Sequence, residues 1–240
     1  WAGGIAGNLK LYAQITECFN NADLWLAVSG ERGDVAWMGG IAGMSDGIIT
    51  DCFNTGDVGA DESAVLHGEM CCGGIVGQAF SREEEAYTKA DSLIARCYTT
   101  GRVVARAVGG LSSQHASAGG IIGGSALQFS TPSGAKHIRV RNCMICAPEI
   151  SAYETKGHYG RGSAGIVGAA HDELEESMRE PNFYLSGITT NDGAILSGSG
   201  GSGAYSQSAN LDWFKNPNDS VPPGYTVQNA RWSWDFQQVW

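Results

Sequence analysis

The sequence predicts an all-β solenoid, a fold in which similar coils stack along one axis. Two recurring phrases predict this fold. A glycine-flanked phrase occurs five times, and a cysteine-containing phrase follows each of its first four copies. Such a recurrence marks stacked units that cannot bury their apolar faces alone.

The glycine-flanked phrase is expected to be a short apolar strand in each copy. It reads G-G-I-A-G at 3–7 and 39–43, G-G-I-V-G at 73–77, G-G-I-I-G at 119–123 and A-G-I-V-G at 164–168. Because stacked copies share one interior, the isoleucines are expected to form a buried ladder. Its members are Ile5, Ile41, Ile75, Ile121 and Ile166.

The second phrase predicts another strand followed by a turn. Residues 49–58 read I-T-D-C-F-N-T-G-D-V, with β-branched and aromatic residues, a Thr-Gly turn and a new strand near Val58. Strict alternation fails, because Ile49 and Phe53 share one parity while Cys52 has the other. This leaves two alternatives open: a bulge, or an aromatic residue that faces outward.

The cysteines of this phrase are expected to form a second ladder of small buried apolar groups. The odd total of seven cysteines argues against a disulfide framework. Cys71-Cys72, the C-x-x-C at 143–146 and His67 lack a second ligand pair at zinc spacing, so neither a metal nor a cofactor is expected. The ladder consists of Cys18, Cys52, Cys97 and Cys143.

Composition fits a folded repeat protein. Of 240 residues, 42% are hydrophobic, and the 35 glycines are about double the average share. The net charge is −10, so nucleic acid is not an expected partner. No apolar run approaches the roughly 20 residues of a membrane-spanning helix. Because the chain opens on Trp1 directly before a repeat, we expect it to adjoin further domains of a longer parent chain.

Successive glycine phrases lie 36, 34, 46 and 45 residues apart, which indicates coils with insertions of variable length. We expect these insertions at 24–38, 58–72, 78–93, 103–118 and 124–139. Two short helices are expected. A capping box at 81–84 leads into a helix over 85–93, and an acidic stretch forms another over 172–179.

The repeat region is expected to cover residues 1–190, and an irregular tryptophan-rich cap residues 191–240. A solenoid must cover its last open coil, and the bulky aromatic residues of this tail suit that role. A platform for sugar rings is the alternative. The capping residues are Trp232, Trp234 and Trp240.

The two phrases resemble the GLUG repeat of surface adhesins of gut Bacteroidetes, filamentous-haemagglutinin-like proteins and immunoglobulin A peptidase stalks. The ending W-S-W-D-F-Q-Q-V-W at 232–240 is similar to the segment that often closes such arrays. The resemblance covers residues 1–170 and this ending; the long insertions and the missing cysteine phrase in the fifth copy depart from it. It implies a right-handed parallel β-helix on a secreted or cell-surface bacterial protein, with an adhesive or structural role and no catalytic residues.

Short matches to enzyme motifs have structural explanations. G-M-S-D-G at 43–47 fits the nucleophile-elbow pattern but extends a repeat phrase without a strand-to-helix context. Two G-x-G-x-x-G strings follow from the high glycine content. The enzymatic alternative is a β-helix polysaccharide lyase or hydrolase, which needs converging carboxylates. The one column that could supply them holds Glu17, Asp51, Arg96 and Asn142.

The sequence therefore favours a non-catalytic adhesin-like or spacer module at the extracellular or outer-membrane surface of a bacterium. Its loops would contact a host glycan or an extracellular protein. Exposed aromatic side chains provide large contact area at low entropic cost. Trp25, Trp37 and Tyr87 are the candidate contact residues, and local packing under the loops is their alternative role.

Overall fold

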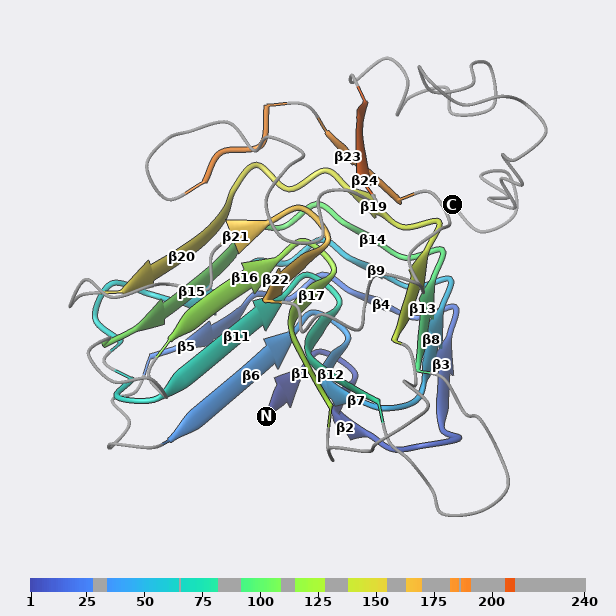
Figure 1. The fold of residues 1–240 in the computed structure, drawn as a ribbon, viewed down its shortest axis with the longest axis horizontal. Helices are drawn as coiled ribbons and strands as arrows, with labels where there is room; N and C mark the ends of the chain where they lie inside the picture. The colour runs from blue at the N-terminus through green and yellow to red at the C-terminus, as the bar shows by residue number, and fades with distance from the viewer. Residues whose placement is uncertain are drawn as a thin grey trace.

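The computed structural model describes residues 1–27, 34–64, 66–81, 92–108, 115–127, 138–154, 163–169, 182–185, 187–190 and 206–209. Within these ranges the chain is all-β, and its strands form five parallel sheets (Figure 1). Each sheet takes its strands from successive repeats in chain order. The architecture of stacked parallel strands is compatible with a β-helix or solenoid.

The first two sheets contain five strands each. Sheet 1 consists of β1 (Ala2–Gly3), β6 (Val35–Gly39), β11 (Glu69–Gly73), β16 (Ala116–Gly119) and β21 (Ser163–Ala164). Sheet 2 consists of β2 (Ala6–Leu9), β7 (Ala42–Ser45), β12 (Val76–Ser81), β17 (Ile122–Leu127) and β22 (Val167–Ala169).

The other three sheets carry the second phrase and the strands after it. Sheet 3 consists of β3 (Gln14–Thr16), β8 (Ile48–Thr50), β13 (Leu93–Ala95) and β18 (Arg139–Arg141). Sheet 4 consists of β4 (Phe19–Asn20), β9 (Phe53–Asn54), β14 (Tyr98–Thr99), β19 (Met144–Ile145), β23 (Asn182–Leu185) and β24 (Ser206–Ala209). Sheet 5 consists of β5 (Leu24–Leu26), β10 (Val58–Ala60), β15 (Val103–Ala107) and β20 (Ile150–Glu154).

We call the strands of one repeat a layer, so that β1–β5 form the first layer and β6–β10 the second. One buried apolar cluster extends through the layers, from Leu9 and Ile15 to Ile166. The isoleucines of the glycine phrase lie side by side in one column, and all of them except Ile5 belong to this cluster. The Ile5 amide donates to the Ile41 carbonyl at 3.1 Å, and the Ile41 amide to the Ile75 carbonyl at 3.0 Å. Ile121 and Ile166 continue this column.

Ile5 differs from the other members of the column because it is exposed. Its side chain is 46% exposed, whereas Ile41, Ile75, Ile121 and Ile166 are fully buried. Ile5 belongs to the first layer, so a described layer packs on only one side of it. The expectation that all five isoleucines are buried is therefore wrong for Ile5.

The glycine phrase forms a corner between two strands, and not the single short strand that the sequence suggested. β6 ends at Gly39 and β7 begins at Ala42. The second glycine of the phrase lies directly opposite a core side chain from sheet 4. A Cβ on Gly40 would lie 2.3 Å from Cγ of Asn54 and 2.3 Å from the Gly74 carbonyl oxygen. Only glycine fits this close approach.

The side chains opposite these glycines form an internal column across sheet 4. Its members in successive layers are Asn20, Asn54, Thr99 and Ile145. Nδ2 of Asn20 donates to Oδ1 of Asn54 at 2.8 Å, and Nδ2 of Asn54 donates to the Gly56 carbonyl at 2.6 Å. The buried amides are thus hydrogen-bonded within the core, as buried polar groups must be.

A second corner explains the broken alternation of the cysteine phrase. Glu17, Asp51, Arg96 and Asn142 have φ values of 54°, 57°, 52° and 52°, which lie in the left-handed region. This corner turns the chain between sheets 3 and 4, so that Ile49 and Cys52 both point inward and are fully buried. Phe53 faces outward, which decides between the two alternatives that the sequence left open.

The expected insertions are shorter than the sequence suggested. Strands lie at both ends of each of the five predicted ranges, as β5 and β6 do in 24–38. These segments have the alternating apolar residues of strands, but no repeated phrase marks them. The described residues contain no helix. The helix expected at 85–93 lies outside them except at its end, where Leu93 begins β13, and the one at 172–179 lies wholly outside.

The C-terminal region is described only in part. β24 pairs in parallel with β23 and extends sheet 4 into the range predicted as irregular. Trp232, Trp234 and Trp240 lie outside the described residues. Among the residues that the structure describes, no helix has the length and apolar character needed to cross a membrane.

The close approach at Gly40 yields a stability prediction. Gly40→Ala is expected to lower the free energy of unfolding by an amount near the upper end of the roughly 1–3 kcal/mol typical of overpacking. The reason is that one of the atoms it would strike is backbone. Gly7→Ala is the matched control, because its Cβ would meet nothing closer than the Trp1 carbonyl at 3.4 Å. Denaturant unfolding of both variants measures the difference; equal stability of the two would contradict the packing argument.

The left-handed corner yields a second stability prediction. Glu17 is exposed and has a φ of 54°, a conformation that asparagine tolerates and β-branched residues avoid. We expect Glu17→Asn to stabilise the protein and Glu17→Val to destabilise it, with a gap of roughly 1–2 kcal/mol between the two. Thermal unfolding compares them, and a Val variant as stable as the Asn variant would refute the role of the corner.

Candidate functional site

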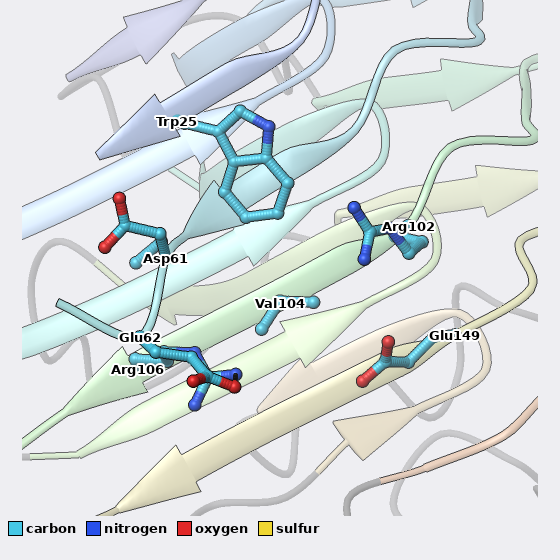
Figure 2. A pocket seen from close by; sticks show the side chains of 8 residues that line it. Trp25, Asp61, Glu62, Arg102, Val104, Arg106 and Glu149 are labelled. Atoms are coloured by element: carbon cyan, nitrogen blue, oxygen red, sulfur yellow. Dashed lines mark ion pairs between the residues drawn. The ribbon is translucent and has the colours of Figure 1, made fainter. Parts of the chain in front are cut away.

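An open groove on the outer face of sheet 5 is the candidate functional site. Its volume is about 470 Å³, within the range of ligand sites. Figure 2 shows Val104 in the middle, Trp25 above it, Arg102 and Glu149 on one side and Asp61, Glu62 and Arg106 on the other. The lining residues are Trp25, Ala60, Asp61, Glu62, Arg102, Val104, Arg106 and Glu149.

The register of sheet 5 arranges the outward side chains in rows that cross the strands. Gly59 pairs with Trp25 on one side and with Val104 on the other, and Val104 pairs with Ser151. The central row is therefore Trp25, Gly59, Val104 and Ser151. Trp25 and Val104 both line the groove, and we call the part of the groove between these two side chains the hollow. The backbone of Gly59 approaches β15 so closely that a Cβ at Gly59 would lie 2.0 Å from the Val104 carbonyl oxygen, which explains the glycine in this row.

One flank of the groove carries a fixed arginine. Arg102 donates from Nε to Oδ2 of Asp57 at 2.8 Å, and its second contact to the same oxygen is 2.7 Å long. This hydrogen-bonded ion pair raises the pKa of Arg102. The guanidinium also lies 5.5 Å from the centroid of the Trp25 ring. Cation–π contact and ion pair together orient both side chains at the edge of the hollow.

The other flank holds a second oriented arginine. The Arg106 guanidinium lies 4.3 Å from the centroid of the Tyr153 ring, and the Tyr153 hydroxyl donates to Oε1 of Glu149 at 3.2 Å. Ser151 Oγ donates to the same Glu149 oxygen at 2.7 Å. Nε of Arg106 is buried and has no hydrogen-bond partner among the described residues. Arg106 approaches Glu62 only at 4.0 Å, and the Glu62 side chain is 93% exposed.

Asp61 lies at the rim of the groove, and its carboxylate is hydrogen-bonded within the turn that follows it. Its Oδ1 accepts hydrogen bonds from the amides of Ser63 and Ala64 at 2.8 Å and 3.0 Å, and from the Ser63 hydroxyl. These hydrogen bonds, the Ser63 hydroxyl first, lower the pKa of Asp61, so the carboxylate stays ionised near neutral pH.

The structure separates the three aromatic candidates. Trp25 is 37% exposed and lies in β5, at the groove, and not in a loop. Trp37 lies in β6 and packs between Trp1 and Phe80, with ring centroids 5.8 Å and 5.3 Å away. Its arrangement is that of local packing. Tyr87 lies outside the described residues.

A stacked aromatic column lies on the outer face of sheet 4. Phe53 stacks on Phe19 and on Tyr98, with centroid distances of 5.1 Å and 5.0 Å and nearly parallel rings. Stacked rings of this kind stabilise the pairing of neighbouring strands. We therefore assign this column a structural role.

The column of Glu17, Asp51, Arg96 and Asn142 does not gather carboxylates. Asp51 accepts two hydrogen bonds from Arg96, including one of 2.6 Å from Nε, and the salt bridge is partly exposed. The Asp51 hydrogen bond raises the pKa of Arg96. Within the described ranges, no group of three His, Cys, Asp or Glu side chains is placed to hold a metal ion.

The four cysteines of the second phrase lie in successive layers. The amides of Phe53, Tyr98 and Met144 donate to the carbonyls of Cys18, Cys52 and Cys97 respectively. All seven cysteines are free thiols. Burial is the largest cause of the raised pKa of Cys97 and of Cys146, the latter to about 11. Cys52, Cys97 and Cys143 are fully buried, whereas Cys18, in the first layer, is partly exposed.

Sequence reasoning identified Trp25 but missed the arginines of the groove. A usable signal was present, because D-V-G-A-D at 57–61, R-V-V-A-R at 102–106 and E-I-S-A-Y at 149–153 occupy the same register. Residues two apart on a strand share a face, so Arg102, Val104 and Arg106 point the same way. The segments share little identity, and for that reason neither repeated phrase includes them.

The fold and the groove define the chain as an all-β protein of stacked parallel sheets with an open polar–aromatic surface site. Comparison of the chain with protein-family models, with curated proteins and with solved structures finds no match in any of the three.

Thiol accessibility provides a test of the layer arrangement. The thiolate is the reactive species, and burial is the largest cause of the raised pKa of Cys97, an inner member of the column. At pH 8 we expect iodoacetamide to modify Cys18 first in the native protein, and Cys52, Cys97 and Cys143 only after denaturation. Peptide mass spectrometry reads the order of labelling; native-state labelling of Cys97 at the rate of Cys18 would contradict the buried column.

Proposed function

We propose that the chain is a right-handed parallel β-helix that acts as a non-catalytic binding module of an adhesin-like surface protein. The sheet order supports the β-helix, since each sheet gains one strand per repeat. Right-handedness is supported by the strong preference of parallel crossover connections for that hand. The resemblance of the two phrases to GLUG repeats supports an extracellular or outer-membrane location on a bacterium.

The single observation that carries the binding role is the groove on sheet 5 that Trp25 and Val104 line. An indole beside a preformed hollow gives a sugar ring or an apolar side chain a face to pack on. Arg102, Arg106 and Glu149 surround the hollow with donors and acceptors held in place by Asp57, Tyr153 and Ser151. Oriented groups of both kinds suit a partner rich in hydroxyl groups, such as a host glycan. A segment of an extracellular protein is the alternative partner.

A β-helix polysaccharide lyase or hydrolase is the second candidate function. The observation that favours an enzyme is the presence of three carboxylates and two arginines in one groove. The carboxylates are those of Asp61, Glu62 and Glu149. Glycoside hydrolysis needs one carboxylic acid with a raised pKa. Asp61 has a lowered pKa, which weighs against it as the acid. Incubation with soluble polysaccharides, followed by chain-length analysis, tests this alternative, and shortened chains would support it.

The binding role predicts different effects for the two tryptophans. Trp25→Ala is expected to abolish binding on a glycan and matrix-protein array and to leave thermal stability nearly unchanged. Trp37→Ala is expected to lower the free energy of unfolding by about 2–3 kcal/mol, because Trp37 packs against Trp1 and Phe80. Phe19→Ala is the control, since it removes an exposed aromatic residue from another sheet. If the wild-type protein binds nothing on the array, the binding role is contradicted and only the spacer role remains.

A further inference from the structure

The charges of the groove restrict the class of glycan that it can take. The groove is lined by the carboxylates of Asp61, Glu62 and Glu149 and by the guanidinium groups of Arg102 and Arg106, so carboxylates outnumber guanidinium groups. Arg102 is already paired with Asp57, which lies beside the groove. The lowered pKa of Asp61 keeps its charge at neutral pH. An anionic sugar would therefore enter a site of excess negative charge on a chain of net charge −10.

Glu149 offers the groove an oriented acceptor. Its Oε1 accepts hydrogen bonds from Ser151 and Tyr153, and these two contacts fix the plane of the carboxylate. Among the described residues, no hydrogen bond reaches Oε2. Figure 2 shows the carboxylate at the edge of the hollow, on the same side as Arg102. A carboxylate held in this way is a strong acceptor for a hydroxyl group.

Arg102 supplies the matching donor. It uses Nε and Nη2 for Asp57, and within the described part of the chain no hydrogen bond involves Nη1. Arg102 and Glu149 occupy the same row of neighbouring strands, because the Val103 amide donates to the Glu149 carbonyl at 3.0 Å. Adjacent strands lie about 4.8 Å apart. Two hydroxyl groups on neighbouring carbons of a sugar ring can therefore meet the donor and the acceptor together.

We propose that the groove selects an uncharged, hydroxyl-rich sugar and rejects sugars that carry a carboxylate. One hydroxyl group donates to Oε2 of Glu149 and its neighbour accepts from Arg102, while the ring packs in the groove against Trp25. Glu149 is the specificity-determining residue, because its charge strengthens the hydrogen bond to a hydroxyl group and repels a carboxylate. This proposal rests on the glycan-binding role proposed above.

Matched pairs of trisaccharides test the selectivity with the full chain. The pairs are cellotriose and its glucuronate counterpart, galactotriose and trigalacturonate, and mannotriose and trimannuronate, together with methyl-esterified trigalacturonate. By calorimetry at low salt we expect at least one neutral sugar to bind 10-fold or more tightly than its acidic partner. The methyl ester is expected to bind more tightly than trigalacturonate. Raising the salt concentration should narrow the gap, because it screens the repulsion.

The outcomes separate this proposal from the one on which it rests. Tighter binding of an acidic sugar than of its neutral partner would overturn the selectivity and leave glycan binding intact. Absence of binding by every trisaccharide, with a silent glycan array, would overturn both. Binding of neutral and acidic partners with equal affinity would likewise overturn the selectivity alone.

Glu149→Gln tests the residue assigned to specificity. The amide oxygen can still accept from Ser151 and Tyr153, so the fold should persist, which thermal unfolding checks. Loss of the charge-assisted hydrogen bond is expected to weaken neutral-sugar binding roughly 10-fold and to narrow the neutral-to-acidic ratio. Asp51→Asn is the control, since it removes a carboxylate paired with Arg96 away from the groove, at a corner that asparagine tolerates. An unchanged ratio in Glu149→Gln would overturn the role of Glu149.

Discussion

The close approach between the second glycine of each phrase and the side chain opposite it sets the cross-section of the molecule. Gly40 leaves room for Asn54, and Gly74 leaves room for Thr99. Because the glycine corner can come this near to sheet 4, sheets 1 and 2 and sheets 3, 4 and 5 share one thin core. The asparagine amides occupy that core with their hydrogen bonds satisfied, and the isoleucine ladder fills the remainder.

The groove lies on the outer face of sheet 5, outside this core, but the strand pairing of the core fixes the positions of the side chains that line it. Inward positions of sheet 5 are apolar in every layer, as with Val58, Val103 and Ile150. The outward positions between them carry unrelated residues, which the fixed register brings into rows. Residues of such rows line the groove, and a tryptophan of the first layer forms part of its wall. The scaffold is thus repetitive while its surface chemistry is local to a few layers.

The repeated phrases were enough to predict the all-β class, the isoleucine column and the order in which equivalent strands meet. They could not predict corners. The left-handed φ of Asp51 shifts the alternation of inward and outward side chains by one residue. The residue type at this position does not predict that conformation, since Glu17 and Arg96 share it. The sequence pointed to Trp25 as an exposed aromatic residue. It did not reveal Arg106 or Glu149, because their meeting depends on pairing between segments about 45 residues apart with little identity.

The dependence of each layer on its immediate neighbours has a consequence for how such a chain can change in length. Every hydrogen bond of the isoleucine column joins one layer to the next, and none skips a layer. Insertion or removal of one whole repeat would regenerate the same contacts at a new junction. A change of one or two residues inside a strand would instead misalign five sheets at once. Growth of this architecture is therefore tolerated in units of one complete layer of strands.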